Sequence, residues 1–399
     1  MALTKLTTNL ISGNIVTSVN GASGAVTVST GTDWVTAIQT ANFTSVASKG
    51  YFVNTTSSEV TITLPVGAVG DEIVIQDYAG TFATNNLILT ANGSEKIQGV
   101  TDDFKCETNN ATVTLIYQDA TKGWTADNIA APSATLTVEY LVIAGGGSGG
   151  ANSNSGGGGA GGYRTNYTGT KFTLTASTNY PVTVGAGGAA KAPSGAGTTG
   201  NSGSNSVFHT ITSTGGGAGG GQGVNGVSGG SGGGGAYDTS GASGNAGGFT
   251  PVEGYAGGAG SSSSPEPGGG GGGASEAGNT DSTGHGGDGA SNSINGSAVV
   301  YAGGGSGGVS SGNAVIPGGD GGGGAGSNNV ATSIAGAINK GAGSGGGSGS
   351  YGSGSGGSGV VILRYPGGYT ISGLSGTTTT VGTDKVTTFT SGTGNIQFN

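Results

Sequence analysis

Runs of glycine between Gly145 and Gly359 constrain this chain more than any other feature. The 399 residues include 96 glycines, and most of them lie in this segment, in runs such as Gly156–Gly159, Gly232–Gly235 and Gly268–Gly273. Glycine has no side chain to bury, and it loses more conformational entropy on ordering than any other residue. The segment is therefore either a low-complexity coil or a structure held together by backbone hydrogen bonds.

Short apolar strands run directly into these glycine runs, and a flexible tether would not need them. We expect the strands to form one small sheet at the base of the segment: Glu139–Ile143, Tyr180–Val184, Val207–Thr212, Ala298–Tyr301 and Val360–Tyr365. Glycine in the polyproline II conformation extends by about 3.1 Å per residue and forms no bonds within its own helix. Such rods can instead bond to one another side by side. The sequence therefore predicts polyglycine II-like rods on a basal sheet, with a partial helical turn at Ile334–Ile338.

The turns at the far end of such rods are the candidate binding surface. They include 152–155, 190–194, 236–240, 249–255, 261–267 and 310–315. Aromatic rings among small polar residues make contacts at low entropic cost. The candidate contact residues are therefore Tyr237, Asp238, Phe249, Glu253 and Tyr255, and the resemblance described below implies that they bind a receptor. The alternative is that these rings hold the turns onto the glycine layer.

Residues 31–133 have an ordinary composition and are expected to form a small antiparallel β-sandwich or barrel. Asp33–Thr40 could form one short helix, and short alternating strands follow it. Val60–Leu64 alternates so that Val60, Ile62 and Leu64 share one buried face, and Trp124 is expected to fill the core. Asp102–Asp103 could suggest a calcium site or an acid/base pair, but adjacent side chains on a strand point to opposite faces, so a solvated loop is expected instead.

Residues 1–30 are expected to form an attachment arm. Asn20–Gly21 is a turn signal before an alternating segment, which predicts a hairpin too small to be stable alone. The segment LTKLTTNLISG resembles the opening of phage tail fibre proteins, and SVNGASGAVTV resembles an element of trimeric phage fibres. The resemblance implies a trimerising hairpin and attachment to the virion. The residues assigned to virion attachment are Leu3, Thr4, Lys5, Leu10 and Ile11.

Residues 134–365 carry a second resemblance. VEYLVIAGGGSGG and GGSGVVILRY are similar to the glycine-rich domain of phage and bacterial surface proteins, and to polyglycine II adhesins at phage tail fibre tips. In those adhesins, turns at one end of the glycine layer bind the host receptor. Residues 366–399 are expected to be a small closing β-unit that either caps the sheet or forms the outermost tip.

The composition excludes several classes of function. Charged residues are 8% of the chain and the net charge is −9, without a basic cluster, so nucleic-acid binding is not expected. The single cysteine, Cys106, and the distant His209 and His285 give no metal-binding pattern. His209 is expected to point out of a strand. We expect no metal, no cofactor, no secretory signal and no membrane-spanning segment.

The whole pattern predicts an all-β phage fibre that is not an enzyme. Its expected location is the virion, as a homotrimer bound to other tail or capsid proteins. Its expected partner on the host is a surface glycan or an outer-membrane protein. The alternatives are a secreted bacterial adhesin or ice-binding protein, and a glycan-degrading tailspike. The last would need paired carboxylates in a cleft, and no convincing pair is present.

Overall fold

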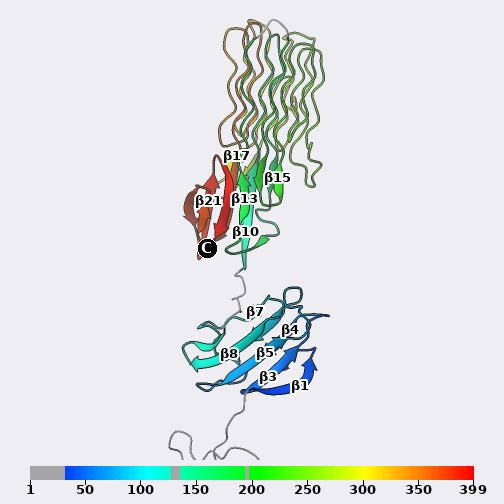
Figure 1. Cartoon of the computed structure of the whole chain (residues 1–399). Helices are drawn as coiled ribbons and strands as arrows, with labels where there is room; N and C mark the ends of the chain where they lie inside the picture. Colours follow the sequence, from blue (N-terminus) through cyan, green and yellow to red (C-terminus); the bar gives the residue numbers. More distant parts are fainter. Residues whose placement is uncertain (1–31, 127–134, 194–196) are drawn as a thin grey trace, which may run out of the picture. The chain divides into compact units, whose positions relative to one another are not determined.

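The computed structural model describes residues 32–126, 135–193 and 197–399, which belong to two units, Met1–Ser133 and Ala134–Asn399. The described residues form strands and turns without any helix, so the chain is all-β (Figure 1). The predicted helix at Asp33–Thr40 is wrong, because Asp33–Gln39 forms strand β1. The predicted helical turn at Ile334–Ile338 is also wrong, because this segment runs through the glycine layer. The predicted attachment arm and hairpin lie outside the described residues.

The first unit consists of two sheets. One has the order β1-β3-β5-β8-β9, with β3 (Lys49–Val53), β5 (Glu72–Asp77), β8 (Thr112–Asp119) and β9 (Gly123–Ala126). The other has the order β2-β4-β6-β7, with β2 (Phe43–Thr44), β4 (Val60–Thr63), β6 (Leu87–Thr90) and β7 (Phe104–Cys106).

The chain alternates between these two sheets, so consecutive strands from β1 to β6 do not pair. Instead β1 pairs with β3 and β3 with β5 in parallel, and β2, β4 and β6 do the same in the second sheet. Only β7, β8 and β9 join by antiparallel pairing. The expectation of an antiparallel sandwich is therefore wrong for most of the unit. Alternating residues reveal the buried face of a strand but not the direction of its partner.

The core of the first unit lies between its two sheets, as the sequence predicts. Val60, Ile62 and Leu64 have no exposed surface, and neither has Trp124. The indole Nε1 of Trp124 is buried and has no hydrogen-bond partner among the described residues. Asp102–Asp103 is exposed in the loop before β7, as expected.

The strands of the second unit form three sheets, whereas the sequence predicted a single basal sheet. The largest contains β10 (Thr135–Ile143), β11 (Tyr163–Thr165), β12 (Phe172–Thr175), β18 (Val360–Pro366), β20 (Thr377–Val381) and β21 (Asp384–Phe389). The next contains β13 (Tyr180–Thr183), β14 (Ser206–Phe208), β15 (Ile211–Ser213), β19 (Ile371–Gly373) and β22 (Thr393–Phe398). The third is the pair β16 (Ala290–Asn292) and β17 (Val299–Tyr301).

An aromatic and aliphatic cluster joins the two larger sheets. It includes Val138 of β10, Phe208 of β14 and Phe389 of β21, all without exposed surface. The predicted strand at Val207–Thr212 is a hairpin, because His209 turns the chain with a φ of 51° between β14 and β15. The His209 ring packs edge-on against Tyr180 instead of pointing into solvent.

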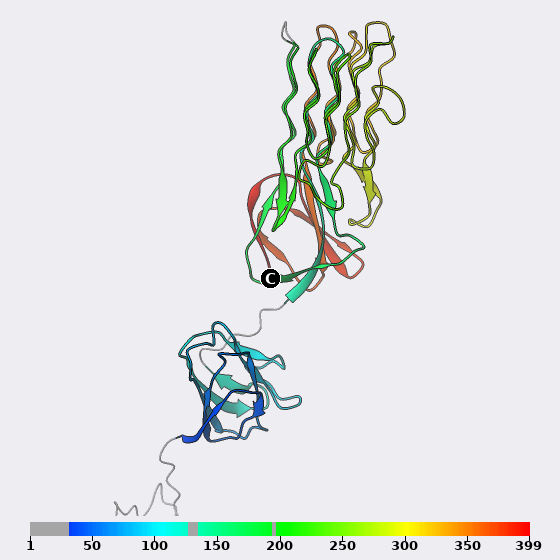
Figure 2. The same cartoon turned by 90° about the vertical axis from the view of Figure 1, so that its right-hand side faces the viewer.

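Residues 366–399 supply strands to the two larger sheets. Strand β21 pairs with β18, and β22 pairs with β13. Of the two roles expected for this segment, the outermost tip is therefore wrong, because its strands complete the base of the unit. The C-terminus lies at that base in Figures 1 and 2.

The glycine runs continue from these strands as extended segments that lie side by side (Figures 1 and 2). They bond to neighbouring runs through the backbone. Gly158 donates to the carbonyl of Ser344 at 2.8 Å and accepts from the N–H of Gly305 at 2.9 Å. A Cβ atom on Gly158 would lie 2.1 Å from the carbonyl oxygen of Gly147. Only glycine allows the runs to approach this closely.

Buried serines complete the bonding where a backbone partner is missing. The Ser344 hydroxyl accepts from the N–H of Gly149 at 2.9 Å and donates to the carbonyl of Gly354 at 2.7 Å. Ser206 and Ser306 bridge an N–H and a carbonyl in the same way. All three serines have no exposed surface. A hydroxyl is both donor and acceptor, so one serine satisfies two buried backbone groups.

Candidate functional site

The turns of the second unit lie at two ends of the glycine layer. The first run leaves β10 after Ile143, reverses at Asn152–Asn154, where φ is 68°, 22° and 41°, and returns to β11. The returning residue Gly156 accepts from the N–H of Gly150 at 3.0 Å, which confirms the reversal. We call this end, away from the strands, the distal end. The end beside the strands is the basal end.

Several turns from distant parts of the sequence meet at the distal end. The N–H of Tyr237 donates to the carbonyl of Asn154 at 3.1 Å. The N–H of Ser310 donates to the carbonyl of Pro265 at 3.3 Å. The predicted far-end turns 152–155, 236–240, 261–267 and 310–315 are thus at the distal end, and the described part of 190–194 bonds there to Ser353.

A hollow of about 300 Å³, which we call the distal pocket, lies between these turns. Its lining consists of residues 153–154, Gln222, Tyr237, Glu266, residues 310–311, Asn329 and residues 348–349. Apart from the Tyr237 ring and one glycine, these residues have small or medium-sized polar side chains. The pocket therefore offers many hydrogen-bonding groups and one aromatic surface.

Asn154 holds the wall of the distal pocket together. The residue is only 9% exposed. Its Nδ2 donates to the carbonyl of Glu266 at 2.8 Å and to the hydroxyl of Ser310 at 2.9 Å. The hydroxyl of Ser348 donates to its Oδ1 at 3.0 Å. The hydroxyl of Ser310 in turn donates to Glu266 Oε2 at 3.1 Å, which fixes that carboxylate.

The structure separates the five candidate receptor-binding residues. Tyr237 and Asp238 are exposed at the distal end. The expectation that 249–255 is a far-end turn is wrong, because the carbonyl of Glu253 accepts from the N–H of Tyr163 at the start of β11. Phe249, Glu253 and Tyr255 therefore belong to the basal side of the layer.

Phe249 and Glu253 have structural contacts there. The guanidinium of Arg164 lies 4.0 Å from the centre of the Phe249 ring, a cation–π contact. Glu253 is 1% exposed, and its carboxylate accepts from the N–H groups of Thr214 at 2.9 Å and Gly247 at 3.3 Å. The alternative expectation was that the aromatic rings hold the turns onto the glycine layer. The contact with Arg164 gives Phe249 this role.

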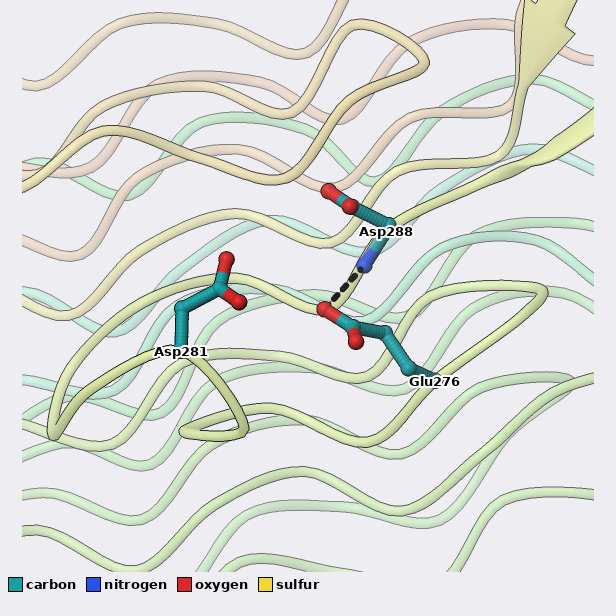
Figure 3. Close-up of side chains that lie close together, drawn as sticks. All are labelled: Glu276, Asp281 and Asp288. Atoms are coloured by element: carbon teal, nitrogen blue, oxygen red, sulfur yellow. Dashed lines mark hydrogen bonds between the residues drawn. The ribbon is translucent and has the colours of Figure 1, made fainter.

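Three carboxylates that the sequence analysis did not group come together beside β16 (Figure 3). One carboxylate oxygen from each of Glu276, Asp281 and Asp288 lies within 4.8 Å of the other two. Oxygen ligands of this kind suit Ca²⁺ or Mg²⁺. Two of the groups already have structural roles, since Glu276 accepts from the N–H of Asp288 at 3.1 Å and Asp288 accepts from the N–H of Asp320 at 2.6 Å.

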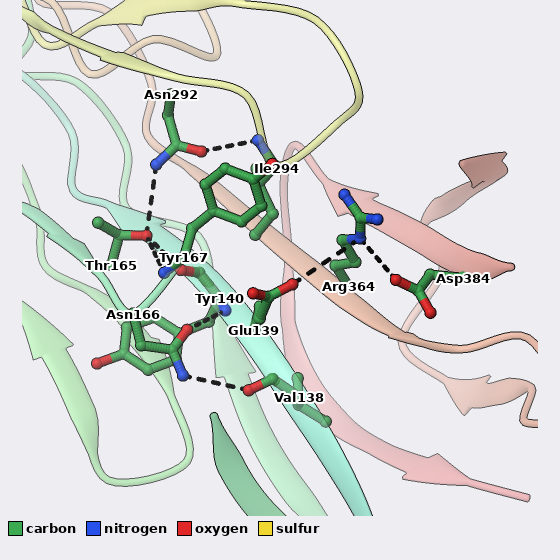
Figure 4. A network of polar contacts seen from close by, with 10 residues as sticks. All are labelled: Val138, Glu139, Tyr140, Thr165, Asn166, Tyr167, Asn292, Ile294, Arg364 and Asp384. Carbon is green, nitrogen blue, oxygen red and sulfur yellow. Dashed lines mark hydrogen bonds and ion pairs between the residues drawn. The ribbon is translucent and has the colours of Figure 1, made fainter. Parts of the chain in front are cut away.

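A polar network crosses the basal sheet (Figure 4). Arg364 Nε on β18 lies 2.8 Å from Asp384 Oδ2 on β21 and 3.8 Å from Glu139 Oε2 on β10. The hydrogen bond that Arg364 donates to Asp384 raises the pKa of Arg364 above its ordinary value. One guanidinium therefore pairs with both carboxylates, and the three charges link three adjacent strands.

The same network fills a gap in strand pairing (Figure 4). Strand β10 pairs with β12 up to Val138 and with β11 from Leu141. Between these two partners, Asn166 accepts from the N–H of Tyr140 at 2.6 Å and donates to the carbonyl of Val138 at 3.2 Å. The amide side chain replaces a strand partner, so this cluster is structural.

Among the residues that the structure describes, no helix has the length and apolar character needed to cross a bilayer.

Comparison with known proteins finds one family. A family model described as "Glycine-rich domain" matches residues 120–366. This range covers the glycine layer and most of its basal strands. No curated protein matches the sequence.

Proposed function

The chain belongs to the glycine-rich domain family, and from this premise we propose that it is a structural phage fibre protein that binds the host cell surface through the distal end of its glycine layer. In this proposal residues 1–30, including Leu3, Thr4, Lys5, Leu10 and Ile11, attach the fibre to tail or capsid proteins. The fibre is a homotrimer in the virion, and the unit containing β1 to β9 acts as a spacer.

We further infer that the glycine runs are packed polyglycine II-like rods. The bonding of Gly158 supports this, because its N–H and its carbonyl bond to two different runs. Rods without internal hydrogen bonds must satisfy their backbone groups in this way. A lattice of this kind would hold its end turns in fixed positions without needing a large apolar core.

One observation carries the functional proposal: turns far apart in the sequence enclose a polar pocket at the end of the layer opposite to the strands. A binding surface on rigid elements loses little entropy when it binds. Among the described residues that line the pocket, Glu266 is the only one with a carboxylate. Glycoside hydrolysis by the usual route needs two, so the pocket supports binding in preference to cleavage.

The test is adsorption of the purified full-length chain, fluorescently labelled, to a panel of bacterial cell envelopes. We expect binding to some envelopes, and loss of at least tenfold in affinity for the double variant Tyr237→Ala/Asp238→Ala. The matched control is Tyr255→Ala, because Tyr255 is 41% exposed, as against 38% for Tyr237, but lies on the basal side. Its adsorption should be unchanged.

Two results would contradict the proposal. One is an unchanged affinity of the double variant for the envelopes that the parent chain binds. The other is the absence of the chain from phage particles probed with an antibody against it. Sedimentation of the chain at three times its mass of 37.3 kDa would support the trimer.

A further inference from the structure

We propose that the distal pocket binds a single neutral pyranose ring of a host surface glycan. This inference rests on the proposed function, because it names the ligand that the distal end would meet on a cell. It concerns the hollow lined by Tyr237, Glu266, Ser311 and Asn329, together with Gln222.

The size of the pocket sets the size of the ligand. Its volume of about 300 Å³ lies at the lower end of the range of about 300–1,000 Å³ for small-molecule sites. This is enough for one sugar ring with its bound water. The pocket would therefore take a terminal sugar or one ring of a chain that passes over it.

The charge of the pocket excludes acidic sugars. The lining residues that the structure describes include the carboxylate of Glu266 and no lysine or arginine. The whole chain also carries a net charge of −9. A sialic or uronic acid would bring a second carboxylate close to Glu266 without a positive partner, and like charges at short range in a partly desolvated site repel each other.

The pocket has hydrogen-bonding groups without partners, and their chemistry fits neighbouring hydroxyls. Among the described residues, no hydrogen bond engages the Tyr237 hydroxyl, Asn329 Nδ2, Glu266 Oε1 or the side chains of Gln222 and Ser311. A carboxylate oxygen accepts from a sugar hydroxyl, whereas an amide N–H donates to the next one. Each hydroxyl of a pyranose ring is both a donor and an acceptor, so adjacent hydroxyls can bond to groups of both kinds.

Tyr237 supplies the apolar contact that a sugar also needs. The residue is 38% exposed, and its backbone N–H is bonded to Asn154, so it is anchored while its ring remains accessible. One face of a pyranose ring carries C–H groups that pack against an aromatic ring. Tyrosine offers this face with few rotamers to immobilise.

The wall of the pocket is already ordered before a ligand arrives. The Asn154 side chain bonds to Ser310 and to the backbone of Glu266, and Ser310 holds the Glu266 carboxylate. Binding then does not have to order these groups, and this preorganisation favours affinity. The distal pocket thus combines an ordered polar wall with an accessible ring.

The experiment is a ligand-observed NMR titration of the full-length chain with methyl pyranosides of glucose, galactose and mannose. Glucuronic acid and sialic acid are the acidic probes. We expect saturation transfer to at least one neutral pyranoside and none to the acids. Tyr237→Ala and Glu266→Gln should each weaken binding at least tenfold. Tyr255→Ala and Ser262→Ala should not, and thermal unfolding checks that each variant is folded.

Cell adsorption separates this inference from the proposed function. If the chain adsorbs to envelopes, periodate oxidation of vicinal diols should abolish adsorption, and protease treatment should not. Adsorption that survives periodate but not protease, with no pyranoside bound, would overturn the inference and leave the adhesive function intact. Pyranoside binding without adsorption to any envelope would overturn the function and leave the pocket assignment intact.

Discussion

A single methyl group distinguishes alanine from glycine, and the interior of the glycine layer has no room for it. At Gly158 an added Cβ would lie 2.1 Å from the carbonyl oxygen of Gly147. That atom belongs to the backbone of a neighbouring run, so it cannot rotate away as a side chain could. The high glycine content is therefore a packing requirement at this position, and not a sign of flexibility.

Gly158→Ala should destabilise the second unit strongly. Overpacking a core typically costs about 1–3 kcal/mol, and we expect a loss at or above the upper end of this range, because the obstacle is backbone. Denaturant unfolding followed by circular dichroism measures it. Gly368→Ala is the control, since no atom lies within 4 Å of its added Cβ. It should change the free energy of unfolding by less than about 0.5 kcal/mol. Equal effects of the two substitutions would contradict the packing argument.

The strands could be predicted from the sequence in large part, but their partners could not. The apolar segments that became β10, β13, β17 and β18 were all expected, because each is a short apolar run before or after glycines. The helix expected at 33–40 is a strand because its residues pair with β3. Pairing is a long-range property, and neither the parallel order of β1-β3-β5 nor the division into three basal sheets has a local signal.

The sequence also did not reveal at which end of the glycine layer each turn lies. Turns alternate between the two ends, so placing one requires a count of every reversal before it. For example, the chain reverses at Gly229–Gly230, where the sequence is glycine-rich and no residue marks the turn. A single run joins the turn with Tyr237 to the turn with Phe249, so the two turns lie at opposite ends, although both were expected at the far end. Tyr237 was placed correctly, whereas Asn154, Glu266 and the polar residues around them were not recognised.

Glu253 was expected to bind the receptor, but its place in a basal turn predicts a role in stability instead. Glu253→Gln replaces an acceptor-only carboxylate that binds two backbone N–H groups. We expect a loss of about 1–3 kcal/mol in the free energy of unfolding, with no change in adsorption of the folded protein. Asp238→Asn, at an exposed carboxylate, should leave stability unchanged. Weaker adsorption by a fully folded Glu253→Gln variant would restore this residue to the binding surface.

At the scale of the whole second unit, the glycine layer joins segments that are distant in the chain. Gly146 bonds to Gly357, and Gly158 to Ser344. Contacts of such long range close large loops, which makes folding slow. They also make the layer cooperative, because no run can leave without breaking bonds to several others.

Amide hydrogen exchange tests this cooperativity. We expect the amides of Gly156–Gly159 and Gly268–Gly273 to be protected to the same degree as those of β10, because all open only with the unit. The exposed residue Gly312, in a distal turn, should exchange rapidly. Mass spectrometry of peptic fragments gives the comparison. Rapid exchange throughout the glycine runs, with β10 protected, would show that the runs are a coil.

The direction of the hydrogen bonds in the layer has a mechanical consequence. The runs extend from the basal strands to the distal turns (Figure 2), and the bonds between them lie across that direction. A force that pulls the distal turns away from the strands loads the bonds in shear, so that many must break together. A force that peels one edge run sideways would break them one after another. The layer is therefore strongest against tension along its length, which is the load that a tether held at both ends must bear.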